Sequence, residues 1–174
     1  MSSEYGIRVT YGALPRAIMD ARHDPALVRR AQREAVAAAL PYLQSKLARA
    51  TPEGATGKAG QMVTADLDAT PAGPVGFVGY AEPAAGYMPF VEYGTRPHWP
   101  PRAAMELYAA RKFGYPSGSP EAKRAGYLIA RKISRYGTPA QHVVENVANA
   151  NRAAAQKLMA RAAIGVFHIA GAGK

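Results

Sequence analysis

The chain has 174 residues, of which 48% are hydrophobic and 20% charged, and this balance is typical of one folded domain of ordinary size. It contains no cysteine, which excludes disulfides, thiolate metal ligands and thiol nucleophiles. Lysine and arginine outnumber aspartate and glutamate by 22 to 12, so the formal net charge is +10 and phosphates or acidic protein surfaces are favoured as partners.

The positive charge is concentrated in the second half of the chain. Residues 1–87 contain 9 basic and 8 acidic side chains, whereas residues 88–174 contain 13 and 4. No basic segment followed by an apolar run is found at the N-terminus, and the longest apolar stretch, AAIGVFHIAGAG, is too short and too rich in glycine to span a bilayer. We therefore expect neither secretion nor a membrane partner.

The N-terminal part of the sequence predicts a short strand and a long helix. Isoleucine and valine alternate with polar residues in YGIRVTYG, residues 5–12, and this two-residue period indicates a half-buried strand. Asp24 followed by Pro25 is typical of a helix start, and apolar residues recur every three or four positions from there to about residue 49. Pro41 lies inside this stretch and lacks a backbone N–H, so we expect a kink or break near it.

The middle of the sequence predicts a small sheet. A turn-rich link over residues 51–60 precedes two strand-like runs, QMVTADLDA and PVGFVGYA, which the TPAG turn at residues 70–73 joins into a hairpin. The next apolar run, MPFVEY at residues 88–93, is β-like and ends at Gly94. We expect it to be a third strand of the same group.

Proline and glycine mark the ends of two helices in the second half of the chain. The first is expected to begin at Pro100 and to end before Gly114, and the second is expected to run from Ser119 to Gly137. The apolar stripe of the second helix is expected to consist of Ala125, Leu128, Ile129, Ile133 and Tyr136.

A last helix is expected to start directly after the second. Thr138 is expected to be its N-cap, with Pro139 at the first position and Gln141 at the third, which is a capping-box arrangement. Together these elements predict an α+β fold, in which a small antiparallel β-sheet packs against one long N-terminal helix and a C-terminal helical group. We expect a single domain over residues 1–174.

The sequence contains no pattern typical of catalysis or of metal binding. The four histidines are scattered, and no two have the i, i+4 spacing of helical metal ligands. His142 and Glu145 stand three apart, and we interpret them as a surface pair. The segment GATGK lacks the first glycine and the hydroxyl residue of a phosphate-binding loop. We therefore expect no catalytic, cofactor-binding or metal-binding residue, and no enzyme.

A basic face is predicted on the helix between Ser119 and Gly137. At about 100° per residue, Arg124, Arg131 and Arg135 share the face opposite Ile129 and Ile133, with Tyr127 beside them. Such a face suits a phosphate backbone, with the tyrosine free to stack on a base. A solvated helix face that keeps the protein soluble explains the same pattern, and both interpretations stay open.

The only tryptophan of the chain lies between prolines in MPFVEYGTRPHWPP. Pro97, Pro100 and Pro101 restrict the backbone around Trp99, so this side chain is held at low entropic cost. It either fills the core beneath the loop or anchors an interface, where tryptophan and arginine are favoured residue types.

Two segments resemble a family of tailed-phage tail components and head–tail joining proteins. GYMPFVEYGTRPHWPP, followed by a short helix and then AGYLIARKISRYGTPAQHVVENV, is similar to that family's V-E-[YF]-G-T, R-P-H-W-P-P, I-A-R-K-I and R-x-G-T pattern. Upstream, TPEGATGKAGQMV resembles its P-x-x-T-G-x-L stretch, except that Ala59 and Gly60 stand near the usual leucine. The resemblance covers about residues 25–150. It leaves out the N-terminal strand and arm, residues 1–24, and the C-terminal helix end and tail, residues 151–174.

The resemblance implies a structural protein of the virion neck, similar in role to the minor tail protein Z class of phage lambda. It would be a head–tail connector or tail-completion subunit that forms a ring, commonly of six copies, through which DNA passes. Its partners would be its own copies, neighbouring head-completion or adaptor proteins, and the tail terminator or tail tube, with transient contact to genomic DNA. It would be located in the virion after assembly in the bacterial cytoplasm. The alternatives are a tail terminator subunit and a basic DNA-binding protein.

Within this hypothesis, we expect a small set of residues to contact a neighbouring copy. The candidates for the subunit interface are Glu92, Arg96, Trp99, Arg131 and Arg135. The candidates for a DNA-facing surface are Arg124, Tyr127, Arg131 and Arg135. Each subunit of a cyclic ring uses two different patches, so we expect the arginine-rich helix to dock on the more neutral first half of the next subunit.

Overall fold

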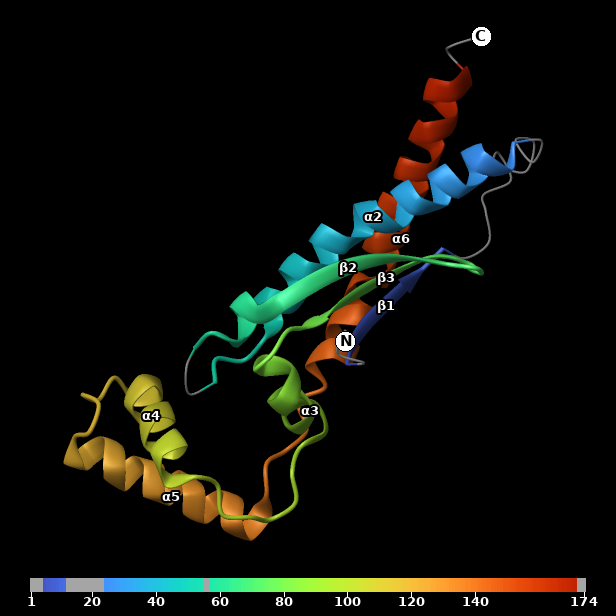
Figure 1. Ribbon diagram of the computed structural model, residues 1–174. Coiled ribbons are helices and arrows are strands. Elements are labelled where there is room, and N and C mark those ends of the chain that lie inside the picture. The colour runs from blue at the N-terminus through green and yellow to red at the C-terminus, as the bar shows by residue number, and fades with distance from the viewer. Residues whose placement is uncertain (1–4, 12–23, 55–56, 172–174) are drawn as a thin grey trace.

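The protein has the expected α+β fold (Figure 1). The computed structural model describes residues 5–11, 24–54 and 57–171, so most of the expected N-terminal arm and the last three residues lie outside the described part. A three-stranded antiparallel sheet has the order β1-β3-β2. The strands are β1 (Gly6–Thr10), β2 (Val63–Thr70) and β3 (Gly73–Tyr80). The N-terminal strand and the β2–β3 hairpin predicted from the sequence are therefore confirmed.

Helices make up most of the remaining chain. They are α2 (Pro25–Ala50), α3 (Ala84–Tyr93), α4 (Arg102–Phe113), α5 (Pro120–Tyr136), α6 (Val143–Gly171) and a short 3-10 helix, η1 (Ala59–Met62). None of the helices in the described ranges has the length and apolar character needed to cross a membrane.

The long N-terminal helix begins as the sequence predicts. One oxygen of Asp24, Oδ1, accepts hydrogen bonds from the backbone N–H groups of Ala26 and Leu27, at 2.9 and 3.1 Å. These two donors have no partner inside the helix, so the cap stabilises its first turn. Of the kink or break expected near Pro41, a break is wrong, because α2 runs through this position without interruption. Leu40 and Leu43 are buried on either side of the exposed Pro41, and this packing holds the helix together.

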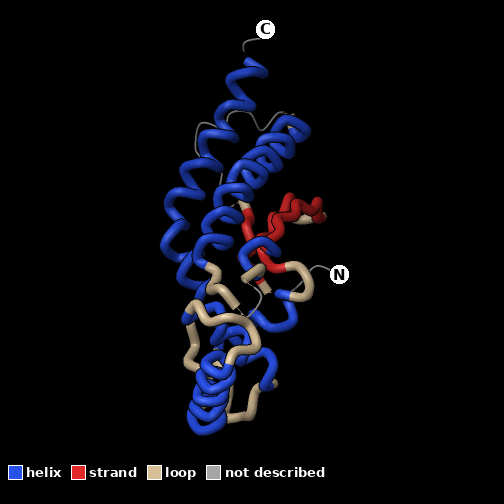
Figure 2. The backbone as a smooth tube through the Cα atoms, turned by 90° about the vertical axis from the view of Figure 1, so that its left-hand side faces the viewer, coloured by secondary structure: helices blue, strands red, loops and turns tan. Residues whose placement is uncertain are grey.

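The core lies between α2, α6 and one face of the sheet (Figure 2). From α2 the buried side chains are Ala31, Ala35, Val36, Ala39, Leu40, Leu43 and Leu47, and from α6 they are Val143, Val144, Val147, Ala155, Met159, Ala163 and Val166. Both sets recur at three- and four-residue steps, so each helix presents one apolar stripe. Each fully buried Leu or Val contributes about 1.5–3 kcal/mol relative to an exposed one. The C-terminal helix therefore belongs to the core well beyond residue 150.

The segment expected to be a third strand of the sheet is a helix. Residues 88–93 form the second half of α3, and the third strand is β1, which pairs with β3. Short apolar runs do not distinguish a strand from a buried helix by pattern alone. In α3, Ala84, Met88 and Glu92 are the buried residues, and their spacing of four is that of one helix face.

Candidate functional site

Two of the segments that carry the phage resemblance meet at the base of a helical hairpin made of α4 and α5. Thr95 and Thr138 form an isolated antiparallel bridge, with hydrogen bonds from Thr95 N to Thr138 O at 3.0 Å and from Thr138 N to Thr95 O at 3.2 Å. Their hydroxyl oxygens are 3.0 Å apart. The two Y-G-T sequences therefore do more than end their helices, because they pair with each other. We call Gly94, Thr95, Gly137 and Thr138 the clasp.

The two glycines of the clasp have matching backbone conformations. Gly94 has φ 75° and Gly137 has φ 69°, values that a residue with a Cβ rarely adopts. A Cβ on Gly94 would overlap with the carbonyl oxygen of Thr138, and a Cβ on Gly137 would overlap with that of Thr95. The clasp therefore requires glycine at both positions for two reasons, conformation and space.

Glu92 fastens the start of α6 beside the clasp. Its carboxylate accepts hydrogen bonds from the backbone N–H groups of Val144, at 3.0 Å to Oε2, and of Glu145, at 3.1 Å to Oε1. Its backbone oxygen also accepts from the N–H groups of Gln141 and His142. A carboxylate at a helix N-terminus satisfies free N–H groups and interacts favourably with the helix dipole.

Two expectations from the sequence are corrected by this geometry. Thr138 is not the N-cap of the last helix, because α6 starts at Val143 and Thr138 bridges to Thr95 instead. Glu92 is only 3% exposed, and both its carboxylate oxygens are used within the chain. Its expected contact with a neighbouring copy therefore does not fit the structure.

Small side chains hold α4 and α5 together. Ala122, Gly126 and Ala130 are buried at intervals of four on α5, and Ala109 and Ala110 are buried on α4. A Cβ on Gly126 would lie 2.8 Å from the backbone nitrogen of Glu106. The two backbones thus approach closely, and Gly126 permits it.

This packing changes the predicted faces of α5. Ile129 and Ile133 are half-buried, as a lining of the hairpin requires. Leu128 and Tyr136, which the sequence assigns to the apolar stripe, are 54% and 75% exposed. The predicted stripe is therefore wrong at these two positions, and α5 presents apolar side chains among its arginines.

The exposed face of α5 combines charge with apolar surface. Arg124, Tyr127, Leu128, Arg131 and Arg135 are all exposed and recur at three- and four-residue steps. None of the three arginine side chains has an ion-pair partner among the described residues. We call these five residues the α5 stripe.

Trp99 adds to the exposed aromatic surface of the hairpin. Its ring stacks on that of Tyr127, with centroids 6.2 Å apart and planes at 30°. The side chain is 61% exposed, so the interpretation that it fills the core beneath the loop is wrong. The nearby Arg96 is exposed and forms no ion pair with Glu92 in the structure.

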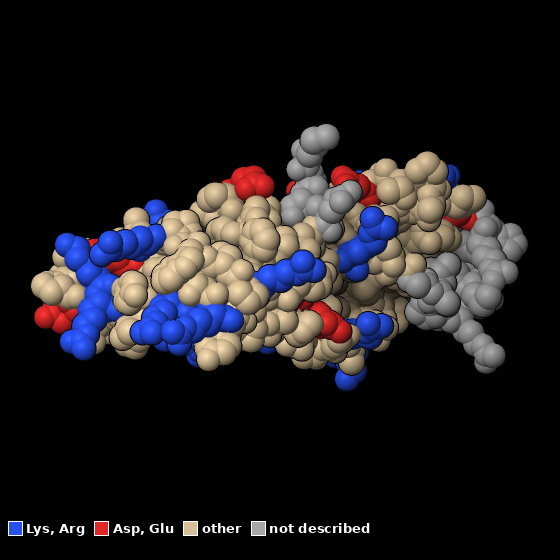
Figure 3. Space-filling model, turned by 90° about the horizontal axis from the view of Figure 1, so that it is seen from below, with Lys and Arg blue, Asp and Glu red and all other residues tan. Residues whose placement is uncertain are grey.

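Positive charge gathers at the hairpin end of the molecule. Residues 96–136 contain nine basic side chains and two acidic ones. Figure 3 shows the blue side chains concentrated toward the left-hand end, where Figure 1 places α4 and α5. The remainder of the chain contains 13 basic and 10 acidic side chains, so the hairpin supplies +7 of the net charge of +10.

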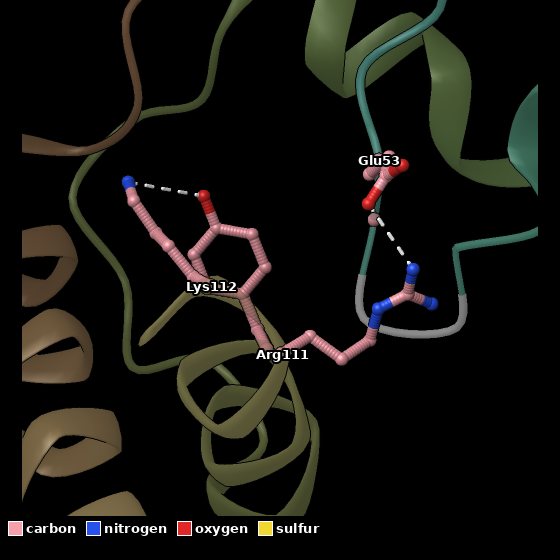
Figure 4. A pocket seen from close by; sticks show the side chains of 5 residues that line it. Glu53, Arg111 and Lys112 are labelled. Atoms are coloured by element: carbon pink, nitrogen blue, oxygen red, sulfur yellow. Dashed lines mark hydrogen bonds and ion pairs between the residues drawn. The ribbon is translucent and has the colours of Figure 1, made fainter. Parts of the chain in front are cut away.

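An ion pair links the hairpin to the body at one further point. Arg111 Nη2 on α4 lies 3.1 Å from Glu53 Oε2, in the loop that follows α2. Figure 4 shows Arg111 reaching this carboxylate while Lys112 points away from it, and the Nζ of Lys112 lies 3.4 Å from the Tyr108 hydroxyl. Both partners of the ion pair are exposed, so it contributes only about 0.2–1 kcal/mol.

Two tyrosines, Tyr80 and Tyr5, have pKa values above the ordinary value of tyrosine. Burial raises the pKa of Tyr80 above its ordinary value, and the hydrogen bond between its hydroxyl and that of Thr51, at 2.8 Å, opposes this shift in part. Burial and then the charge of Glu92 raise the pKa of Tyr5. Both groups are tyrosines inside the fold, and neither lies on the exposed face of the hairpin.

Within the described residues, no group of three or more histidine, aspartate or glutamate side chains is arranged to hold a metal ion. His142 Nδ1 and Glu145 Oε2 lie 3.3 Å apart at the surface, as the interpretation of a surface pair expected. In comparisons with known proteins, no protein-family model matches the chain, and neither a curated protein nor a solved structure matches it.

Proposed function

We propose that this protein is a structural subunit of the neck of a tailed bacteriophage, a head–tail connector or tail-completion protein. It would assemble with copies of itself into a ring, commonly of six by the resemblance, through which DNA passes. Its neighbours in the virion would be head-completion or adaptor proteins on one side and tail proteins on the other. Two of the segments that carry the resemblance, V-E-Y-G-T and R-Y-G-T, contain the four residues of the clasp, and Glu92 in the first of them caps the start of α6.

The observation that supports an assembly role is the exposed surface of the hairpin. Trp99, Tyr127 and Leu128 are each about half exposed or more, and they lie among arginines that have no ion-pair partner in the described part of the chain. Exposed apolar side chains that cluster with arginine are typical of protein interfaces. A hairpin that packs chiefly on itself and projects from the body is suited to reach a neighbouring molecule (Figure 1).

Electron microscopy of the purified protein, alone and mixed with tail tubes, tests the proposal. We expect rings whose diameter matches the end of a tube, and density for the protein at the neck of complete particles. A protein that stays monomeric at high concentration and is absent from purified particles contradicts the proposal. Rings that cap isolated tubes before heads are present would favour the tail terminator alternative.

The α5 stripe favours a second candidate function, in which the protein acts mainly as a DNA-binding protein. Arg124, Arg131 and Arg135 lie on one exposed face with Tyr127, an arrangement that suits phosphates and a stacked base. Phosphate contacts make affinity fall with salt, with a slope of about −0.9 per contacted phosphate in a log–log plot. A slope near zero for duplex DNA, measured by fluorescence anisotropy, would exclude this candidate.

A further inference from the structure

The sheet has one face that no described helix covers. The covered face packs on α2 and contains Ile7, Val9 and Val78 among its buried residues. The opposite face, which we call the open sheet face, consists of Arg8, Thr10, Thr64, Asp66, Asp68, Thr70, Val75 and Phe77. Figure 2 shows α2 and α6 on one side of the red strands, with the open sheet face turned away from them.

The open sheet face has an apolar centre beside an acidic edge. Phe77 and Val75 on the central strand are only half-buried. Asp66 is the register partner of Phe77, and Asp68 is the register partner of Val75. Neither aspartate has an ion-pair partner within the part of the chain that the structure describes. The strand that bears them, β2, is also an edge strand with one side unpaired in the described sheet.

The α5 stripe matches the β2 side and the centre of this face in charge, apolar character and spacing, whereas Arg8 lies on the opposite side, on β1. Arg131 and Arg135 are one helical turn apart, about 6 Å along the axis. Asp66 and Asp68 are two residues apart on one face of a strand, about 7 Å. Leu128 precedes Arg131 by three residues on the same helix face, where it is available to pack on an apolar surface.

One chain does not bring these two surfaces together. Helices α4 and α5 pack on each other, and neither has an extended contact with any strand of the described sheet. The pairing therefore requires a second copy. Because the two surfaces are different, each copy would offer its hairpin to one neighbour and its sheet to the other, and such head-to-tail contacts produce either a closed ring or a filament.

We propose that the α5 stripe of one copy docks on the open sheet face of the next, with Arg131 and Arg135 opposite Asp66 and Asp68. Leu128 and the Trp99–Tyr127 pair cover Val75 and Phe77 in this arrangement. This inference rests on the proposed ring-forming function and names the two surfaces that would make the ring. It assigns the arginines to a protein partner, and DNA is the alternative occupant.

Charge reversal on each surface, and then on both, tests the pairing. The sheet variant is D66K/D68K, the hairpin variant is R131E/R135E, and the third protein carries all four substitutions. Association of the wild type and the variants is measured by light scattering coupled to size exclusion, at low and high salt. Circular dichroism confirms that each variant is folded, and R29E/R33E, on two exposed arginines one turn apart on α2, is the matched control.

We expect each two-residue variant to weaken association about tenfold or more, because like charges then face each other. The four-residue variant should regain most of the association, and R29E/R33E should associate as the wild type does. A wild type that forms rings while D66K/D68K or R131E/R135E does so equally well overturns the pairing but not the proposed function. A monomeric wild type overturns both. Loss of duplex DNA binding by R131E/R135E, with association unchanged, overturns the pairing and assigns the stripe to DNA.

Discussion

Thr95 and Thr138, 43 positions apart in the chain, are joined by a pair of backbone hydrogen bonds and a contact between their hydroxyl oxygens. Everything between them is the helical hairpin and its connections. The clasp therefore controls where the hairpin leaves the body and where the chain returns to it.

Replacement of Gly137 by alanine should open the clasp. The new Cβ would overlap with the carbonyl oxygen of Thr95, and the positive φ would be strained as well. We expect G137A to lower the free energy of unfolding by about 2–4 kcal/mol, measured by urea denaturation. Gly114 has nearly the same φ, 70°, but its ψ of 23° lies in the left-handed helical region, whereas the ψ of Gly137 is −160°. Apart from the adjacent residues, no atom lies within 4 Å of the point that an alanine Cβ would occupy at Gly114, so G114A should cost clearly less than G137A. Equal effects of G137A and G114A would contradict the close approach.

Replacement of Glu92 by glutamine should weaken the junction of α3 and α6. Glutamine keeps the size of the side chain but has one acceptor oxygen in place of two, so one of the two N–H groups of α6 loses its partner. We expect E92Q to cost about 1–3 kcal/mol in the free energy of unfolding. E145Q, at an exposed glutamate nearby, is the control and should cost less than about 0.5 kcal/mol. A neutral E92Q would show that the buried carboxylate does not stabilise the helix start.

Stability should fall at alkaline pH in a way that depends on Tyr80. Its pKa is higher in the folded state than in the unfolded chain, so the folded state holds the proton more tightly. The stabilisation is complete below the unfolded pKa of about 10 and is lost as pH rises above it. Y80F removes this titration and should lose less stability than the wild type between pH 9 and pH 11. At pH 8, Y80F should be about 1 kcal/mol less stable than the wild type, because the hydrogen bond to Thr51 is absent.

Y136F, at an exposed tyrosine, is the control for the change from tyrosine to phenylalanine. Parallel curves of stability against pH for Y80F and the wild type would refute the assignment of the alkaline loss of stability to Tyr80.

Replacement of Gly126 by valine should loosen the hairpin and leave the body folded. A Cβ at this position already crowds the backbone of Glu106, and a branched side chain would push α4 and α5 apart. We expect faster hydrogen exchange and faster proteolysis within residues 96–136, with the melting of the α2–α6 core nearly unchanged. K123V, at an exposed position of the same helix, tests whether valine alone has this effect. Cooperative loss of the whole structure in G126V would show that the hairpin and body unfold together.

Local signals in the sequence are sufficient for most of the elements. The Asp24–Pro25 start of α2, the β2–β3 hairpin and the ends of α4 and α5 at Gly114 and Gly137 are each decided by a few neighbouring residues, and each prediction is confirmed. The class of fold follows from these elements.

Most of the errors concern interactions between residues far apart in the chain. Residues 88–93 form a helix because Met88 and Glu92 face α6 and the core, which no pattern within the segment reveals. Sequence reasoning places Glu92 at the surface because a glutamate is rarely buried, and its partners lie more than 50 positions away. The recurrence of Y-G-T at both ends of the hairpin is the one available signal for the clasp.

The narrow gap between Thr95 and Thr138 means that the hairpin enters and leaves the body at a single point. A chain that lacked residues 97–136 would need only a tight turn to connect its two halves, since bridged strands are joined by turns of two residues in many proteins. The hairpin is therefore an insertion between two residues that already lie side by side. A hairpin of another length or charge could be joined at the same point without a change in the sheet or in the two long helices α2 and α6.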